Sequence, residues 1–229
     1  MKAAVIVFPG SNCDRDVKVA LEASIGTAPA MVWHGDGALP DCDLIVLPGG
    51  FSYGDYLRSG AMAANSPIMR AVIAQARRGT RLLAICNGFQ IAAEAGLLPG
   101  VLMPNASLKF VCKDVLLRVD SADSPFTRNY APGAIVRMPI AHRDGNYFAA
   151  AAELDALEEE NLIAFRYCDA QGTPSAAANP NGSARNIAGI FNRERSILGM
   201  MPHPERLADA RLGGDHGKAM FDGLMAALA

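Results

Sequence analysis

Short apolar runs alternate along the chain with segments in which apolar residues recur at helical spacing. This alternation is typical of a parallel sheet whose strands are connected by covering helices. The predicted fold class is therefore α/β, a single domain with a mostly parallel, partly mixed sheet and helices on both faces. The predicted strands are Ala3–Phe8, Ala30–His34, Leu44–Leu47, Leu82–Ile85, Val115–Val119, Ile135–Ile140, Leu162–Tyr167, Ile187–Phe191 and Ser196–Met200.

The early and the late apolar runs differ in pattern. The early ones, from Ala3–Phe8 to Leu82–Ile85, lack alternation, which predicts that other elements cover both of their faces. Val115–Val119 and the later runs mix apolar with polar residues, which predicts an antiparallel portion. No internal repeat or linker divides the chain, so a single domain is expected.

Two helices have clear start and stop signals. Asp14–Ile25 places Val17 and Leu21 on one stripe and stops at Gly26. The second has Ser66 as its N-cap, with proline at the first helical position, and continues to Gly79. A third helix, predicted from about Asp215, presents a stripe that we interpret as core, made of Met220, Phe221, Leu224, Met225 and Leu228.

Charge and hydropathy narrow the classes of function. The formal net charge is −2, and 51% of the residues are hydrophobic. No basic region is visible that would bind nucleic acid or an anionic membrane. No segment is long and apolar enough to cross a bilayer, and the first apolar run ends at Pro9-Gly10, too early for a signal peptide.

The five cysteines include no Cys-x-x-Cys pair. Their odd number argues against a disulfide framework and predicts a reducing, cytoplasmic location. With only four histidines, no metal site is expected. A free cysteine is most often a small buried hydrophobe, and we interpret Cys13, Cys42, Cys112 and Cys168 in this way.

Cys86 has a different context, because it ends an apolar run and is followed at once by Asn87 and Gly88. Small residues on both sides let a strand and a helix cross tightly, with a strained, exposed nucleophile held between them. The start of the next helix favours the thiolate, and the Asn87 N–H is placed to donate to an oxyanion. Cys86 is therefore the candidate nucleophile.

His203 stands between two prolines, with Glu205 two residues on. Many histidines only cap or pack, but flanking prolines fix the backbone and remove local donors. A distant histidine with a carboxylate supplies a general base and its orienter. The spacing does not determine whether both side chains point inward.

The turn Pro48–Phe51 follows a predicted buried strand. Alone it is an ordinary β-turn. Beside a nucleophile, its Gly-Gly backbone can approach a substrate closely and offer the second oxyanion donor. Removing one such donor typically lowers the rate about 10²–10³-fold.

Together these residues resemble the triad (class I) glutamine amidotransferases, through the Pro-Gly-Gly turn, Cys86 with Gln90, and His203-x-Glu205. Longer strings are similar to one subfamily, the glutaminase subunits of phosphoribosylformylglycinamidine synthase. These strings are Pro48–Arg58, Ile85–Gln90, Ile140–His142, Asn179–Ser183 and Met201–Arg206. The resemblance covers nearly the whole length and implies one glutamine amidotransferase type 1 domain over residues 1–229, with a flavodoxin-like fold.

The resemblance implies that a thiol attacks the side-chain amide of L-glutamine, that ammonia leaves, and that water hydrolyses the glutamyl thioester. Cys86 is then the nucleophile, His203 the general base and acid, and Glu205 its orienter. Ala84 stands where the family has a glycine at the head of the elbow. The resemblance places the backbone of Gly50 and Asn87 at the oxyanion, and Phe51, Gln90 and His142 in the glutamine pocket.

The chain shows no ATP-binding signature and has little length to spare for a synthetase domain. If it makes ammonia for biosynthesis, another polypeptide must use it. The resemblance names that partner as an ATP-dependent synthetase subunit, which uses ATP and Mg to convert formylglycinamide ribonucleotide to formylglycinamidine ribonucleotide in de novo purine biosynthesis. It also implies a small accessory subunit, and no cofactor in this chain.

Two rival functions remain open at this point. A stand-alone cysteine hydrolase or peptidase on the same fold would turn over peptides or esters without a partner. A redox-sensing or scaffold domain would use Cys86 for oxidation and His203 only for structure. In the second case, reactive glutamine analogues would not label Cys86.

Overall fold

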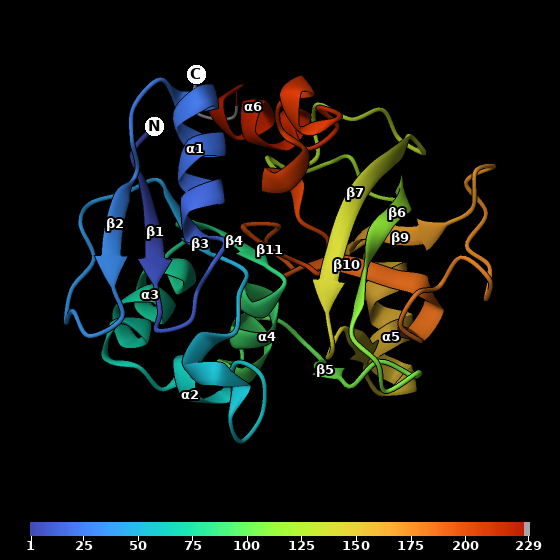
Figure 1. The fold of residues 1–229 in the computed structure, drawn as a ribbon, viewed down its shortest axis with the longest axis horizontal. Coiled ribbons are helices and arrows are strands. Elements are labelled where there is room, and N and C mark those ends of the chain that lie inside the picture. The colour runs from blue at the N-terminus through green and yellow to red at the C-terminus, as the bar shows by residue number, and fades with distance from the viewer. Residues whose placement is uncertain (227–229) are drawn as a thin grey trace.

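The computed structural model describes residues 1–226, which form a nine-stranded mixed sheet between helices and a separate two-stranded sheet (Figure 1). The strands are β1 (Ala3–Val7), β2 (Ala30–Trp33), β3 (Leu44–Leu47), β4 (Arg81–Ile85), β5 (Val101–Met103), β6 (Val111–Val119), β7 (Ile135–His142), β8 (Asn146–Phe148), β9 (Ile163–Cys168), β10 (Ile187–Phe191) and β11 (Ile197–Met200). The helices are α1 (Asp14–Ile25), α2 (Ala61–Ala64), α3 (Pro67–Arg77), α4 (Asn87–Glu94), α5 (Ala151–Glu159) and α6 (Lys218–Ala226). Short 3₁₀ helices lie at Ser52–Asp55, Ala184–Asn186, Pro204–Leu207 and Ala210–Leu212.

The large sheet has the order β2-β1-β3-β4-β11-β10-β9-β6-β7. From β2 to β11 neighbouring strands are parallel, and from β11 to β7 they are antiparallel. The predicted mostly parallel, partly mixed sheet and its late antiparallel portion are therefore confirmed. The separate sheet, β5 with β8, was not predicted, because three-residue strands leave little pattern.

Helices cover both faces, as predicted. The chain moves in opposite directions along the sheet after β1 and after β3, so right-handed crossovers place α1 and α3 on opposite faces. α1 packs against α6, whereas α4 lies over β3, β4 and β11 on the side of α3 (Figure 1). Within residues 1–226, no helix combines the length and the apolar character that a bilayer span requires.

The predicted helix signals act as expected at the first two helices. α1 has the predicted bounds, and Gly26 ends it in the left-handed region, with φ 77° and its N–H donating to Glu22 O. α3 begins where predicted, with Ser66 at the N-cap position and proline in its first turn, but the Ser66 side chain makes no capping hydrogen bond. The last helix was predicted too early, since it begins at Lys218, after a turn in which Lys218 N–H donates to Asp215 O at 2.9 Å. The predicted stripe residue Leu228 lies outside the described residues.

One prediction about coverage was wrong. β2 lies at the edge of the sheet, where Met31 and Trp33 are 40% and 49% exposed. An apolar run without alternation, such as residues 30–34, predicts that both faces of the strand are covered only when other strands lie on both sides of it. β1, β3 and β4 have such neighbours, and almost all of their residues are buried.

Candidate active site

Four chain segments that carry chemical groups meet at one edge of the sheet. β1, β3, β4 and β11 are parallel, so their carboxyl ends coincide. They are followed by the loop with Cys13, the turn with Gly50, the elbow with Cys86 and the turn with His203, respectively. The carboxyl edge of an open parallel sheet is where such folds bind ligands.

The predicted elbow is present at Cys86, but the residue is buried, at 4% exposure, where an exposed nucleophile was expected. This residue has φ 50° and ψ −105°, and its N–H donates to Met200 O at 2.7 Å. A non-glycine residue at positive φ is strained, and such strain often occurs at functional sites. The following glycine is required by space, because a Cβ on Gly88 would lie 2.0 Å from Leu47 O. At the head of the elbow, Ala84 is fully buried and pairs with Gly199 on the neighbouring strand.

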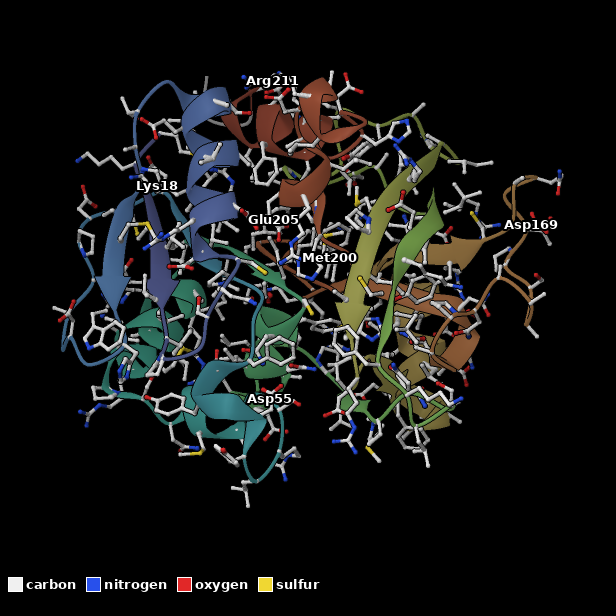
Figure 2. The ribbon with its side chains drawn as sticks, in the orientation of Figure 1. Lys18, Asp55, Asp169, Met200, Glu205 and Arg211 are labelled. Carbon is white, nitrogen blue, oxygen red and sulfur yellow. The ribbon has the colours of Figure 1, made fainter. Side chains whose placement is uncertain are left out.

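His203 and Glu205 form a buried pair. His203 Nδ1 lies 2.6 Å from Glu205 Oε1, and the two residues are 1% and 2% exposed. The backbone N–H of His203 donates to Pro139 O on β7 at 2.9 Å, which fixes the turn. Figure 2 shows Glu205 near the centre of the molecule, close to Met200 at the end of β11. Both side chains therefore point inward, which the spacing left undetermined.

The environment of His203 favours its charged form. Burial lowers its pKa, but the charges of Glu205 and Cys86, with the nearby thiols of Cys13 and Cys86, raise it well above the ordinary value. Within residues 1–226, His203 Nε2 is buried and has no hydrogen-bond partner. The site thus holds a proton on the imidazole next to the Cys86 sulfur.

Cys13 was interpreted as an ordinary core cysteine, and its burial, at 1% exposure, agrees with this. Its position, however, is next to the predicted catalytic pair. Cys13 Sγ, a nitrogen of His203 and an oxygen of Glu205 lie within 4.8 Å of one another. Arg206 Nη2 donates to Cys13 Sγ at 3.0 Å. These three groups are of the types that hold metals, but the guanidinium beside the sulfur and the His203–Glu205 hydrogen bond account for them without one. The carboxyl-edge rule, applied to the loop after β1, was the signal that could have found Cys13.

The turn after β3 is held close to the loop after β1. Gly50 has φ 145°, and a Cβ there would lie 2.8 Å from the backbone of Ser11 and Asn12. Cys13 N–H donates to Gly49 O at 3.2 Å, which ties the two segments together. No acceptor within residues 1–226 takes the backbone N–H of Gly50 or that of Asn87. Both donors therefore remain available, which is compatible with the oxyanion role expected from the sequence.

A cavity of about 260 Å³ opens beside Cys86. Phe51, Gln90 and His142, which the resemblance places in the glutamine pocket, line this cavity, and so does Gly50, which it places at the oxyanion. Asn87 is not part of the cavity lining, and its side-chain amide donates to Asp55 Oδ1 and Gln90 Oε1. The cavity also contains Asp55 and Asp144, which sequence reasoning missed because carboxylates in polar loops give no periodic signal.

His142 presents a neutral acceptor to this cavity. Asn105 uses its Nδ2 to donate to two carbonyls, so its Oδ1 accepts from His142 Nδ1 at 3.1 Å. Burial and the nearby charge of His203 lower the pKa of His142 to about 4. Its Nε2 therefore carries no proton at neutral pH, and it is buried without a partner in the part of the chain that is described.

Comparison with known proteins gives consistent matches over the whole chain. A family model described as the CobB/CobQ-like glutamine amidotransferase domain matches residues 1–213. Two curated relatives, from Rhodospirillum rubrum and Zymomonas mobilis, are each 56% identical over 230 residues, 100% of this chain and 100% of the relative. Both are named phosphoribosylformylglycinamidine synthase subunit PurQ. A chain in the structure of PurLQS from Thermotoga maritima is 42% identical, with a TM-score of 0.88 over 100% of this chain and 99% of that one.

The fold and these matches define a class I glutamine amidotransferase. Within that class, the chain belongs to the PurQ family. The predicted family and fold are thereby confirmed.

Proposed function

We propose that this chain is the glutaminase subunit of phosphoribosylformylglycinamidine synthase, a single amidotransferase domain over residues 1–229 that hydrolyses the side-chain amide of L-glutamine. The observation that carries the proposal is the position of Cys86, which is strained at a strand-to-helix elbow and lines a cavity near the buried His203–Glu205 pair. The names of the relatives at 56% identity support the same reaction.

In the first half-reaction, the Cys86 thiolate forms a bond to the amide carbon of glutamine. The charge that develops on the amide oxygen accepts hydrogen bonds from the backbone N–H groups of Gly50 and Asn87. His203 gives its proton to the nitrogen, the C–N bond breaks, and ammonia leaves a glutamyl thioester. Glu205 holds the imidazole in orientation and stabilises its charged form.

In the second half-reaction, neutral His203 removes a proton from water. The resulting hydroxide attacks the thioester carbon, the C–S bond breaks, and glutamate leaves with the Cys86 thiolate restored. The sum is glutamine and water converted to glutamate and ammonia, with no oxidant or cofactor required in this chain. Each step uses the same oxyanion donors.

The ammonia is delivered to an ATP-dependent synthetase subunit, which uses ATP and Mg to convert formylglycinamide ribonucleotide to formylglycinamidine ribonucleotide. The relative at 42% identity belongs to the PurLQS assembly, which supports such a partner and a small accessory subunit. A cytoplasmic location belongs to the same proposal. All five cysteines are free, as expected in a reducing compartment.

The decisive test is Cys86→Ala in the reconstituted complex with the synthetase subunit. Synthesis driven by glutamine should be lost, whereas synthesis driven by ammonium should survive, because the synthetase site is intact. Cys112→Ala is the matched control, since Cys112 is exposed on β6. Persistence of glutamine-driven synthesis in Cys86→Ala would refute the nucleophile, and hydrolysis of peptides by the isolated chain would favour a stand-alone hydrolase.

A further inference from the structure

Two carboxylates, those of Asp55 and Asp144, line the cavity beside Cys86. Asp55 comes from the segment after β3 and Asp144 from the turn after β7 (Figure 2 labels Asp55 near α4). Within residues 1–226, neither carboxylate forms an ion pair. Asp144 Oδ2 accepts from Ser59 Oγ at 2.7 Å, but its buried Oδ1 has no partner there.

The two acids are close enough to disturb each other. Burial, followed by the charge of Asp144, raises the pKa of Asp55 to about 6, although hydrogen bonds from Asn87 and Ser59 oppose this. Like charges held together in a half-buried site are unfavourable until a cation lies between them. A local conflict of this kind is expected where a ligand supplies the missing charge.

Independent features of the cavity indicate which ligand this is. His142, 2% exposed, contributes an unpartnered acceptor nitrogen to the same cavity, and Cys86 contributes the sulfur. Both acids come from segments that are tied to the first turn of α4, because Gln90 Nε2 donates to the backbone Asp144 O at 2.6 Å and Asn87 Nδ2 donates to Asp55 Oδ1 at 3.2 Å. From Cys86 to Gln90, which contacts the Asp144 backbone, the helix rises about 6 Å, comparable to the extended length of a glutamine side chain.

The charge pattern also suits a zwitterion. Arg143 lines the cavity and is exposed, and no hydrogen bond or ion pair within the described chain holds its guanidinium. An amino acid carries both an ammonium for the two acids and a carboxylate for this guanidinium. A neutral amide carries neither.

We propose that Asp55 and Asp144 together form the subsite that binds the α-ammonium group of glutamine and so select an amino acid over a simple amide. This rests on the proposed glutaminase function, because the sulfur of Cys86 defines the amide end of the cavity. The ammonium occupies the position between the two carboxylates and donates to Asp144 Oδ1.

The test compares L-glutamine with 4-carbamoylbutanoate, the same molecule without the ammonium group, as substrates of the assembled complex. The variants are Asp144→Asn and Asp55→Asn, which keep the shape of the side chain. Each should lower kcat/KM for glutamine about 10- to 100-fold through KM, because a charged hydrogen-bonding partner is lost. Turnover of the analogue should fall far less, so the preference for glutamine collapses. Asp123→Asn, whose side chain is 96% exposed and distant from the cavity lining, is the matched control.

Two results would overturn the subsite. One is an unchanged preference for glutamine in both variants. The other is an equal loss with both substrates, which would assign the two acids a structural role only. Failure of the proposed function looks different, because then the wild-type complex would form no product from glutamine at all.

Discussion

His203 Nδ1 and Glu205 Oε1 lie 2.6 Å apart, and both residues are buried. The opposite nitrogen of the ring, Nε2, has no hydrogen-bond partner within the described chain. The hydrogen bond fixes the tautomer and the plane of the imidazole. It thereby leaves Nε2 for the chemistry, in the arrangement that triad enzymes use.

Glu205→Gln should lower glutamine-driven kcat by up to about 10⁴-fold, because the amide favours the wrong tautomer and cannot stabilise the imidazolium. Ammonium-driven synthesis by the complex should be unaffected. Glu159→Gln, on an exposed residue at the end of α5, provides the control. Steady-state rates with the two nitrogen donors check this, and a Glu205→Gln enzyme with normal glutamine turnover would contradict the assigned role.

Two sulfurs approach His203, but of these only Cys86 lines the cavity. An electrophilic chloroketone analogue of glutamine should therefore alkylate Cys86 and not Cys13. Mass spectrometry of peptides should find the label lost in Cys86→Ala and retained in Cys13→Ala. Label on Cys13 in the wild-type chain would show that the nucleophile has been assigned to the wrong thiol.

His142 should remain neutral well below neutral pH, because its pKa is lowered to about 4. The pKa of this base is lowered because its surroundings disfavour the charged form, so His142 is protonated only as the pH falls towards 4. Long-range ¹H–¹⁵N spectra should show the proton on Nδ1, donated to Asn105, at pH 6. His203, whose pKa is raised, should be charged at that pH. A titration of His142 near pH 6.5 would disprove this assignment.

Asp55→Asn should stabilise the free protein at alkaline pH. The pKa of Asp55 is raised from 3.8 to about 6, so its carboxylate destabilises the folded state fully above pH 6 and less as the pH falls towards 4. We expect the Tm of the variant to exceed that of the wild type by roughly 2–4 °C at pH 8 and by less at pH 5. Asp123→Asn should show no such pH-dependent gain, and an equal difference at both pH values would exclude the electrostatic cause.

Gly88→Ala should disrupt the elbow, because the new Cβ would lie 2.0 Å from Leu47 O, a backbone atom that cannot move aside. Overpacking of this kind typically lowers the free energy of unfolding by about 1–3 kcal/mol. Gly37→Ala is the control, since a Cβ there meets nothing within 4 Å. Chemical denaturation measures both, and equal stability of the two variants would refute the steric argument.

Local signals in the sequence predicted much of the fold. Gly26 ends α1 and a proline begins α3 where expected, because these signals act on the backbone within one helical turn. The edge position of β2 and the late start of α6 were not predicted. They depend on which strands lie beside β2 and on the turn from Asp215 to Lys218 that stands where the helix was expected to begin.

For the site, the sequence alone determined the elbow at Cys86 and the His-x-Glu pair, because small flanking residues and prolines act on the adjacent backbone. Only the tertiary structure decided that Cys13 and Arg206, 193 positions apart, share the surroundings of His203. It also decided that Asp55 and Asp144 line one cavity. The physical reason is that parallel strands distant in sequence end at the same edge of a sheet, so the groups that follow them meet there.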